Sequence, residues 1–303
     1  MQASHRPRAP AHRSAGPVLL TLPAGEGGRT MSATPLRRGP AGHRPWPCCR
    51  RCSGIALDLG SARTRVWISG RGTILDVPTI TFPGAGAIHP IRRGAIVDTP
   101  GTARMLERLL GNRLPRLGRP LVVVTAPVLD GVAFRAEALT AVQVLRPRTV
   151  LTVPTARAVA LAAGADLCRP LMVVDIGAQV TEVVLLSDGA VLDARRTALG
   201  TRDLDDTTTA DGITGAVADM ITAMLRQDRT SLTLDAIQGG LLLAGGGALR
   251  PEIVHRLTGQ LHAPVRAVPA PHTAAVRGAA RLLEAAHTHP AFSGRQPVPH
   301  LHH

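Results

Sequence analysis

Two short segments of this chain carry an aspartate, a glycine and a threonine at the same spacing. Residues 58–66 read DLGSARTRV, and residues 175–183, which lie 117 positions later, read DIGAQVTEV. The agreement continues without a gap, because Gly72–Asp76 aligns with Gly189–Asp193 and both end on Leu-Asp. Each copy is predicted to form a strand, a turn at the D-x-G sequence and two further strands. We interpret the match as an internal repeat and not as chance agreement between two hairpins.

The residue types at these turns are suited to binding a phosphate group and its metal ion. An aspartate at a strand end can hold a divalent cation through water, so Asp58 and Asp175 are the predicted Mg²⁺ residues. A glycine lets the backbone approach phosphate oxygens, and turn N–H groups and nearby hydroxyls donate to them. Two such turns facing each other would bind a nucleotide between two lobes. The candidate binding residues are Asp58, Gly60, Ser61, Ala62, Arg63 and Thr64 in the first turn, and Asp175, Gly177, Ala178 and Gln179 in the second.

A third glycine cluster follows the apolar run Leu241–Ala244 and precedes a predicted helix. A glycine-rich helix start allows close approach of the backbone to an adenosine and its α-phosphate, because the helix N-terminus favours negative charge. A lone GGG is a weak signal, but here it follows two predicted phosphate turns in chain order. It adds Gly245, Gly246, Gly247, Ala248 and Leu249 to the candidate nucleotide-binding residues.

The elements that must position these turns alternate between strands and helices. Strands are predicted over Ile55–Leu59, Arg63–Ser69, Thr73–Phe82, Leu121–Thr125, Val150–Val153, Leu171–Ile176, Thr181–Leu186, Ala190–Arg195, Leu241–Ala244 and Val265–Val268. Helices are predicted over Thr102–Leu110, Val132–Leu145, Pro154–Ala163, Ile213–Leu225, Leu249–Leu261 and Thr273–Ala286. This order predicts an α/β fold in two halves, each with a start rich in hairpins.

The composition excludes several kinds of chemistry. The chain has 303 residues and a formal net charge of +14, but all 35 of its Lys and Arg residues are arginine. Without lysine there is no Walker A lysine, no pyridoxal-phosphate Schiff base and no protein-kinase lysine. With no Tyr, 3 Phe and 2 Trp, base-stacking platforms for single-stranded nucleic acid are not expected.

The positive charge is concentrated at the start of the chain. Residues 1–53 hold 9 Arg and 1 Glu and are rich in Pro and Gly, so they are predicted to be disordered. Met31 within them also allows a later translation start. We divide the chain into this segment, a first lobe over 54–153, a second lobe over 154–287 and a non-core tail over 288–303. Because most of the excess charge lies outside the predicted lobes, a nucleic-acid partner is not expected.

The four cysteines and the hydropathy indicate a reduced, cytoplasmic protein without a transmembrane segment. Three cysteines are bunched in the sequence CCRRC at 48–52, which would need a fourth ligand to hold zinc. Cys168 is expected to be a thiol without a partner. The tail histidines are expected to bind metal only adventitiously.

The quoted motifs resemble the phosphate-one, phosphate-two and adenosine motifs of the actin, heat-shock-70 and sugar-kinase superfamily. The best match is to MreB-type bacterial actins, through DLGSART, VVDIGAQVTEV and LLLAGGGALR and through the flanking segments ILDVPTITF, AIHPIRRGAIVD, VLTVPTARAVALAAG and VRGAARLLE. The resemblance covers roughly residues 54–286. It implies two RNase-H-like lobes around Mg-ATP or Mg-ADP, and filaments that organise wall synthesis and rod shape.

The chain departs from that family at its small subdomains and at its catalytic positions. Only Pro83–Ala87 and Thr201–Gly212 remain where the family has its two insertions. The family's water-orienting Glu is replaced by Val153, and its phosphate-two Thr by Val180. Since valine cannot orient water, we expect at most a residual ATPase.

Two further points concern the same turns. The family's phosphate-two glycines become Ala178 and Gln179, which would be strained if either required a positive φ. Other acids, Asp130, Glu137 and Glu182, could act as bases, but solvated helix or strand positions are the more expected role. Arg63 could pair with a phosphate or lie on the surface.

We therefore predict a shortened actin-like protein of cell shape or wall growth, with weak nucleotide binding and impaired hydrolysis. It would act through protein partners, either a full-length bacterial actin homologue or the wall-synthesis machinery, and reach the membrane only through them. The alternatives are a small phosphotransferase of the same superfold and a basic nucleic-acid-binding protein.

Overall fold

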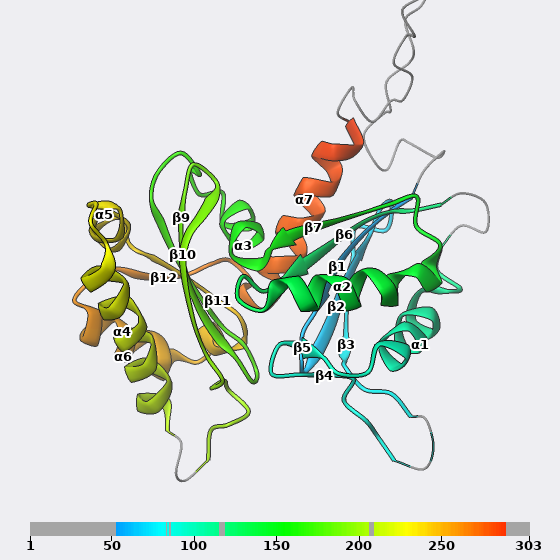
Figure 1. Cartoon of the computed structure of the whole chain (residues 1–303), viewed down its shortest axis with the longest axis horizontal. Helices are drawn as coiled ribbons and strands as arrows, with labels where there is room; N and C mark the ends of the chain where they lie inside the picture. Colours follow the sequence, from blue (N-terminus) through cyan, green and yellow to red (C-terminus); the bar gives the residue numbers. More distant parts are fainter. Residues whose placement is uncertain (1–52, 83, 85, 115–118, 206–208, 289–303) are drawn as a thin grey trace, which may run out of the picture. The chain divides into compact units, whose positions relative to one another are not determined.

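A computed structural model describes residues 53–82, 84, 86–114, 119–205 and 209–288 (Figure 1). Its first five-stranded sheet has the order β3-β2-β1-β6-β7. These strands are β1 (Gly54–Leu59), β2 (Arg63–Ile68), β3 (Ile74–Pro78), β6 (Leu121–Ala126) and β7 (Thr149–Pro154). Strands β1, β2 and β3 form an antiparallel meander, and β1, β6 and β7 run parallel.

The second five-stranded sheet repeats this arrangement with the order β10-β9-β8-β11-β12. Its strands are β8 (Leu171–Ile176), β9 (Thr181–Ser187), β10 (Ala190–Thr197), β11 (Leu241–Ala244) and β12 (Val265–Ala267). Again the first three strands are antiparallel and the last two continue in parallel. The repeat read from the sequence is therefore a repeat of topology, and the predicted α/β fold with two lobes is confirmed.

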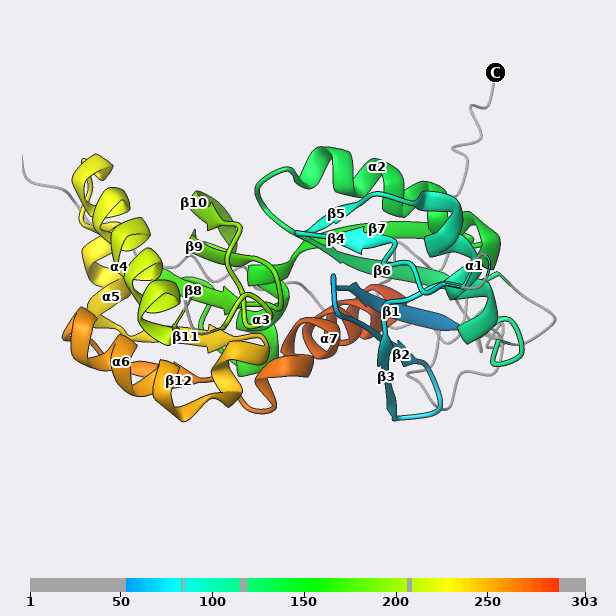
Figure 2. The same cartoon turned by 90° about the horizontal axis from the view of Figure 1, so that it is seen from below.

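The first sheet is covered by α1 (Thr99–Leu110) and α2 (Gly131–Val142) on one face and by α7 (Ala274–Thr288) on the other (Figure 2). Side chains of β1 alternate between the two layers, as the period of a strand requires. Ile55 and Leu57 pack with α1 and α2, and Ala56 packs with α7. Both faces of β1 are buried, which is why Ile55–Leu57 form a continuous apolar run.

The second sheet lies between α4 (Ala210–Gln227), α5 (Leu232–Gln238) and α6 (Pro251–Leu261) on one face and α3 (Thr155–Ala163) on the other. The strands alternate in the same way. Val174 packs toward α4 and α6, and Val173 packs toward α3. Each lobe is thus a sheet buried between two helical layers.

The helix that follows each sheet in the chain packs on the other sheet. Helix α3 follows the first sheet but covers the second, and α7 follows the second sheet but covers the first. The two helices cross at small residues. A Cβ atom added at Gly278 would lie 1.7 Å from the carbonyl oxygen of Ala158, so only glycine allows this approach. This exchange joins the lobes, although the sequence placed α7 wholly in the second.

Several elements differ from the sequence-based predictions. Helix α1 begins at Thr99 and not at Thr102, because the Asp98 side chain caps it by accepting from Gly101 N at 2.7 Å. The signal was present, since an aspartate followed by Pro100 is typical of a helix start. Helix α5 was missed. So was the two-stranded sheet of β4 (Ile91–Arg92) and β5 (Ala95–Ile96), whose strands are too short for a periodicity.

The boundaries of the lobes extend slightly beyond the predicted ones. Ser53 is buried and its carbonyl accepts from Leu121 N at 2.9 Å, and α7 continues to Thr288. The predictions of disorder in 1–52 and of a tail in 289–303 lie outside the described residues, as do the CCRRC cysteines and the tail histidines. Among the described helices, none has the length and apolar character needed to cross a bilayer.

The two connections in which the resemblance implies insertions are short. Between β3 and β4 the described residues hold only the isolated bridge between Thr81 and Ile88. Between β10 and α4 they hold no helix or strand.

Candidate functional site

One pocket of about 420 Å³ is lined by both lobes where the two D-x-G turns meet. It includes most of the residues predicted from the sequence. These are Asp58, Gly60, Ser61, Ala62, Arg63, Asp175, Gly177, Ala178, Gln179, Gly245 and Gly246. The predicted residues Thr64, Gly247, Ala248 and Leu249 do not line it.

The two turns are built by the same backbone contacts. Gly60 N donates to Arg63 O at 3.1 Å in the first turn, and Gly177 N donates to Val180 O at 2.8 Å in the second. A Cβ atom on either glycine would lie 2.8 or 2.9 Å from that same oxygen. Glycine is therefore required by the tightness of both turns. The strain considered for Ala178 and Gln179 does not arise, because neither residue has a positive φ.

The carboxylate of the first turn is neutralised within its own lobe. Asp58 and Arg65 are opposite each other in the β1–β2 register, and their side chains form an ion pair of 3.3 Å. Thr125 Oγ1 also donates to Asp58 Oδ1 at 3.0 Å. Arg65 additionally contacts Asp76 at 3.3 Å. The first wall of the pocket thus carries a balanced set of charges.

The carboxylate of the second turn has the opposite environment. Asp175 is opposite Glu182 in the β8–β9 register, so two acids lie side by side. Burial in the pocket wall, and then the nearby Asp58 and Glu182 carboxylates, raise the pKa of Asp175 to about 7, against the lowering effect of Arg65. Within the described residues, the Asp175 carboxylate has no hydrogen-bond or ion-pair partner. It is therefore the acid in this pocket that is available to a bound cation.

Glu182 is buried and reaches across to the first lobe. Its carboxylate accepts from Val128 N and Leu129 N, both at 3.1 Å. Burial raises the pKa of Glu182, and these amides partly offset the effect. The expected solvated position is therefore wrong for Glu182. The prediction of a solvated position agrees better with Asp130, whose side chain is 81% exposed. It also agrees with Glu137, which is exposed and accepts from Thr99 Oγ1.

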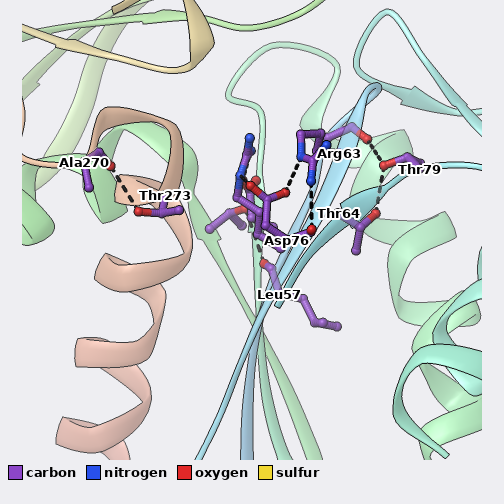
Figure 3. A network of polar contacts seen from close by, with 11 residues as sticks. Leu57, Arg63, Thr64, Asp76, Thr79, Ala270 and Thr273 are labelled. Atoms are coloured by element: carbon purple, nitrogen blue, oxygen red, sulfur yellow. Dashed lines mark hydrogen bonds and ion pairs between the residues drawn. The ribbon is translucent and has the colours of Figure 1, made fainter. Parts of the chain in front are cut away.

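Two side chains of the first turn are already committed to partners within the lobe (Figure 3). Arg63 Nε donates to Asp76 Oδ1 at 2.6 Å, and Arg63 Nη2 donates to the Asp76 carbonyl at 2.8 Å. Thr64 is fully buried, and its hydroxyl is 2.9 Å from that of Thr79. Thr64 therefore stabilises the turn from behind and does not face a ligand.

The third glycine cluster contributes its first two residues to the pocket. Gly245 has a φ of 81°, and a Cβ atom there would lie 2.3 Å from Ile176 O and 2.4 Å from Asp175 Oδ1. Gly247 instead packs against the Ile176 side chain, and Leu249 is 56% exposed outside the pocket. The cradle is thus formed by Gly245 and Gly246 beside the second turn.

The two valines at positions for which the resemblance implies catalytic residues lie in different places. Val180 lines the pocket and offers only methyl groups to it. Val153 is 6% exposed and packs with Ala56 and Val276 in the core beneath α7. Neither side chain can accept or donate a proton.

Sequence reasoning missed five polar residues of the pocket, which are Arg65, Thr155, Thr201, Arg202 and His272, and it named Glu182 only as a solvated acid. Arg65 and Glu182 occupy equivalent positions in the repeat and could have been identified as the strand neighbours of the two aspartates. Thr201 and Arg202 are held by backbone contacts, because Thr201 N donates to Gly177 O at 3.0 Å and Arg202 N to Ala178 O at 2.8 Å. No sequence pattern indicated them.

A turn between β4 and β5 connects the two lobes at the pocket. Arg93 N donates to Gln179 Oε1 at 2.9 Å, and Gly94 N donates to Ser61 Oγ at 3.1 Å. The Arg93 guanidinium donates to Ala198 O and contacts Asp203 Oδ1 at 3.2 Å.

A second arginine reaches in the opposite direction. From β10, Arg196 contacts Asp130 Oδ2 at 2.9 Å and also donates to the carbonyls of Leu129 and Arg93. We call Arg93, Arg196 and these contacts the interlobe clasp.

The arrangement fits a magnesium nucleotide. The glycine cradles leave room for phosphate oxygens at the backbone, and the Asp175 carboxylate has no hydrogen-bond or ion-pair partner in the part of the chain that the structure describes. The described part of the chain holds no group of three or more His, Cys, Asp or Glu side chains arranged to coordinate a metal ion directly. A cation at Asp58 and Asp175 would therefore be held through water and ligand oxygens, as Mg²⁺ commonly is.

Comparison with known proteins identifies the family. The model of the MreB/Mbl protein family matches residues 83–211 and 207–290. The cell shape-determining protein MreB of Escherichia coli K12 is 26% identical over 185 residues, which cover 50% of this chain and 53% of that protein. Mbl of Bacillus cereus is 25% identical over 166 residues, covering 46% and 50%. The chain spans about half the length of the curated relatives it matches.

Solved structures show the same fold at lower identity. MreB5 of Spiroplasma citri bound to ADP superposes with a TM-score of 0.67 at 16% identity, over 78% of this chain and 97% of that one. The MamK double helical filament gives 0.63 at 15% identity, over 77% and 98%. Because the family model matches well over half of the sequence, the chain belongs to the MreB/Mbl family of actin-like proteins.

Proposed function

We propose that this protein binds a magnesium nucleoside di- or triphosphate between its two lobes and acts in cell shape or wall growth. The observation that carries the proposal is the meeting of both D-x-G turns and the Gly245–Gly246 cradle in one pocket. The structures of MreB5 bound to ADP and to AMPPNP, which share the fold, support a nucleotide as the ligand.

The turn backbones and the two aspartates have different roles in the proposed binding. The backbone N–H groups of the two turns face the phosphates, and Asp58 and Asp175 hold the cation through water. The bound Mg²⁺ would offset the negative charge of the phosphates against the pocket's carboxylates. Arg65 limits the repulsion at Asp58 by pairing with it at 3.3 Å.

Hydrolysis is proposed to be weak. A general base must lie within hydrogen-bond reach of the attacking water. Val180 and Val153 provide no such group, and Glu182 is already engaged with two backbone N–H groups of the first lobe. A bound nucleotide would therefore persist, and the protein would act through its complexes and not through turnover.

Assembly is proposed to depend on a partner. The stretches that remain at the family's insertions are short and offer little apolar surface, whereas a specific interface usually buries about 800 Å² per partner. We propose that the protein does not form protofilaments alone and instead binds a full-length bacterial actin homologue or a wall-synthesis protein. ATP-dependent sedimentation of the purified protein as double protofilaments would contradict this. The cytoplasmic location, at the membrane only through partners, stays a prediction.

The test of nucleotide binding is calorimetric titration of Mg-ATP and Mg-ADP into the full chain, with phosphate release followed in parallel. We expect saturable binding without appreciable turnover. Asp58→Ala and Asp175→Ala should each weaken binding, whereas Asp219→Ala, which removes an exposed aspartate on α4, should not. Absence of binding would overturn the proposed ligand, and rapid phosphate release would overturn the proposed impairment. No observation on the described residues favours the phosphotransferase or nucleic-acid alternatives.

A further inference from the structure

The outer strand β7 of the first sheet lacks the features that usually protect a sheet edge (Figure 1). In the described part of the chain β7 pairs only with β6, so one side of its backbone is unpaired. The strand is six residues long, its sequence TVLTVP holds no charge, and Leu151 within it is 38% exposed. Such an edge presents a row of N–H and C=O groups with which an extended chain can pair.

The other three edges of the two five-stranded sheets are protected. Strand β3 contains Asp76 and ends at Pro78. Strand β10 contains an aspartate and two arginines, and its pairing register shifts next to Asp193. Strand β12, which takes the place of β7 in the repeated fold, is three residues long with Arg266 at its centre. Charges, proline and irregular pairing discourage the addition of a further strand, so β7 differs from the edges with which it can be compared.

Three arginines gather where β7 begins. Arg146 and Arg148 precede the strand and are exposed. The Arg119 guanidinium lies beside them, because it donates to the carbonyls of Arg146 and Pro147 at 3.4 and 2.9 Å. Within the ranges that the structure describes, none of the three arginines forms an ion pair with a carboxylate. A chain that pairs with β7 is therefore favoured if it carries acidic residues beside this end of the strand.

Charge decides which chain fits this edge. Residues 146–157 contain three arginines and no acidic residue, so the β7 strand of a second copy brings no carboxylate to them in either strand direction. Residues 1–52 hold nine arginines and one glutamate, and residues 289–303 hold one arginine and no acid, so these segments do not match either.

We infer that β7 is a docking edge for an extended, acidic segment of a partner protein, which adds a strand to the first sheet. Backbone hydrogen bonds to β7 supply affinity in this mode of recognition, and side chains beside the strand supply specificity. Here the specificity comes from carboxylates that meet Arg146 and Arg148. The inference rests on the proposal that the protein acts through a partner, and it names the surface and the chemistry of that contact.

The test uses the full chain and a labelled synthetic peptide, which has a pair of glutamates at each end and alternating valine and threonine between them. Either strand direction then brings carboxylates to the arginines. Fluorescence anisotropy measures the affinity, and hydrogen exchange over residues 149–153 should slow when the peptide binds, because pairing protects the backbone of β7. A peptide whose two central residues are replaced by proline keeps the charges but cannot form the ladder, so it should bind about tenfold more weakly.

Variants of the protein test the two parts of the inference separately. The double change Arg146→Glu and Arg148→Glu should lower the affinity for the acidic peptide about tenfold, and it should raise the affinity for the same peptide with lysine in place of glutamate. Leu151→Glu places a charge within the edge and should also weaken binding of the acidic peptide. Leu225→Glu on α4 makes the same change at a leucine that is equally exposed, at 38%, and should leave the affinity unchanged.

The inference is overturned if the wild type does not bind the acidic peptide, or if it binds the proline or lysine peptide equally well. Unchanged hydrogen exchange over 149–153 in the complex would also overturn it, because no strand would have been added. A wild-type dimer that Leu151→Glu dissociates would make a second copy the occupant. The affinity for Mg-ADP is measured separately at the pocket, so each of these failures leaves the proposed nucleotide binding standing.

Discussion

The two D-x-G hairpins have the same backbone and opposite electrostatics. In both, a glycine N–H closes the turn on the carbonyl three residues later, and the aspartate lies opposite the same position of the next strand. That position is Arg65 in the first hairpin and Glu182 in the second. One aspartate is therefore paired at 3.3 Å, and the other has a carboxylate as its neighbour and a pKa raised to about 7.

The difference shows which features the repeated fold requires. The turn glycines cannot vary, because a Cβ atom would contact backbone in both lobes. The strand position is free to change charge, because its side chain points to the cleft and finds a partner there. Arg65 finds that partner in its own lobe, whereas Glu182 finds it in the backbone of Val128 and Leu129 of the other lobe. The same strand position therefore neutralises the aspartate in the first hairpin and forms a contact between the lobes in the second.

The largest expected effect comes from breaking the helix exchange on which both lobes depend. Gly278→Ala places a Cβ atom 1.7 Å from Ala158 O, which forces α3 and α7 apart. We expect a loss of about 3 kcal/mol of unfolding free energy, because overpacking at a backbone contact cannot relax easily. Urea unfolding of the wild type and of this variant measures the loss.

The control is Gly215→Ala on α4, where an added Cβ atom meets nothing within 4 Å. That variant should gain about 0.5–1 kcal/mol, as expected for alanine in a helix interior. Equal stability of the two variants would show that the crossing of α3 and α7 is not a tight contact.

The next effect is a difference of sign between the two aspartates. Asp175 has a pKa raised from 3.8 to about 7 in the folded chain, so the folded state retains its proton while the unfolded state ionises. Its contribution to stability is therefore lost as pH rises from about 4 to about 7 and stays lost above that. Asp175→Asn should stabilise the fold on the order of 2 kcal/mol at pH 8, below the full value of the shift because the carboxylate lines an open pocket.

The matched variant Asp58→Asn should do the opposite. It leaves Arg65 with a weaker partner and should cost about 1–2 kcal/mol at pH 8. Urea unfolding of both variants at pH 5 and pH 8 tests the predicted signs. The stabilisation that Asp175→Asn gives should be smaller at pH 5. The same sign for both variants would remove the electrostatic contrast between the lobes.

A smaller effect tests whether Glu182 joins the lobes. Glu182→Ala removes the acceptor of two amides, so hydrogen exchange at Val128 and Leu129 should rise about tenfold, corresponding to about 1.4 kcal/mol of local protection. The equivalent change in the first hairpin, Arg65→Ala, should leave that exchange unchanged, because Arg65 forms its ion pairs with Asp58 and Asp76 of its own lobe. Mass-spectrometric exchange on the peptide spanning 127–131 measures both variants. Similar increases in the two would mean that the segment responds to charge and not to the contact.

The comparison also shows which features of the molecule could be predicted from the sequence. The two sheets followed from apolar runs and from an ungapped repeat, because strand periodicity and turn glycines are local signals. Eleven of the predicted residues line the pocket, because they lie on turns that the three motifs identify, and their role in binding stays a prediction. The clasp was not found, because Arg93 and Arg196 lie 103 positions apart and meet only when the lobes assemble. Glu182 was assigned to solvent for the same reason, because its partners are backbone amides that carry no residue signature.

The smallest expected effect concerns Arg63, which occupies the place in the first turn that Val180 occupies in the second. Arg63 could have been a phosphate ligand, but its guanidinium is held by the side chain and carbonyl of Asp76. The pair is exposed, with 45% of the Arg63 side chain accessible, so Arg63→Val should change stability by less than about 1 kcal/mol. Because this arginine is not free to approach a ligand, the affinity for Mg-ADP should stay within about threefold of wild type, which is less than 1 kcal/mol. Calorimetric titration of Mg-ADP into Arg63→Val, beside Asp175→Ala as the variant expected to lose affinity, measures this. A tenfold loss of affinity in Arg63→Val would show that the arginine of the first turn binds a phosphate, although its guanidinium is held by Asp76.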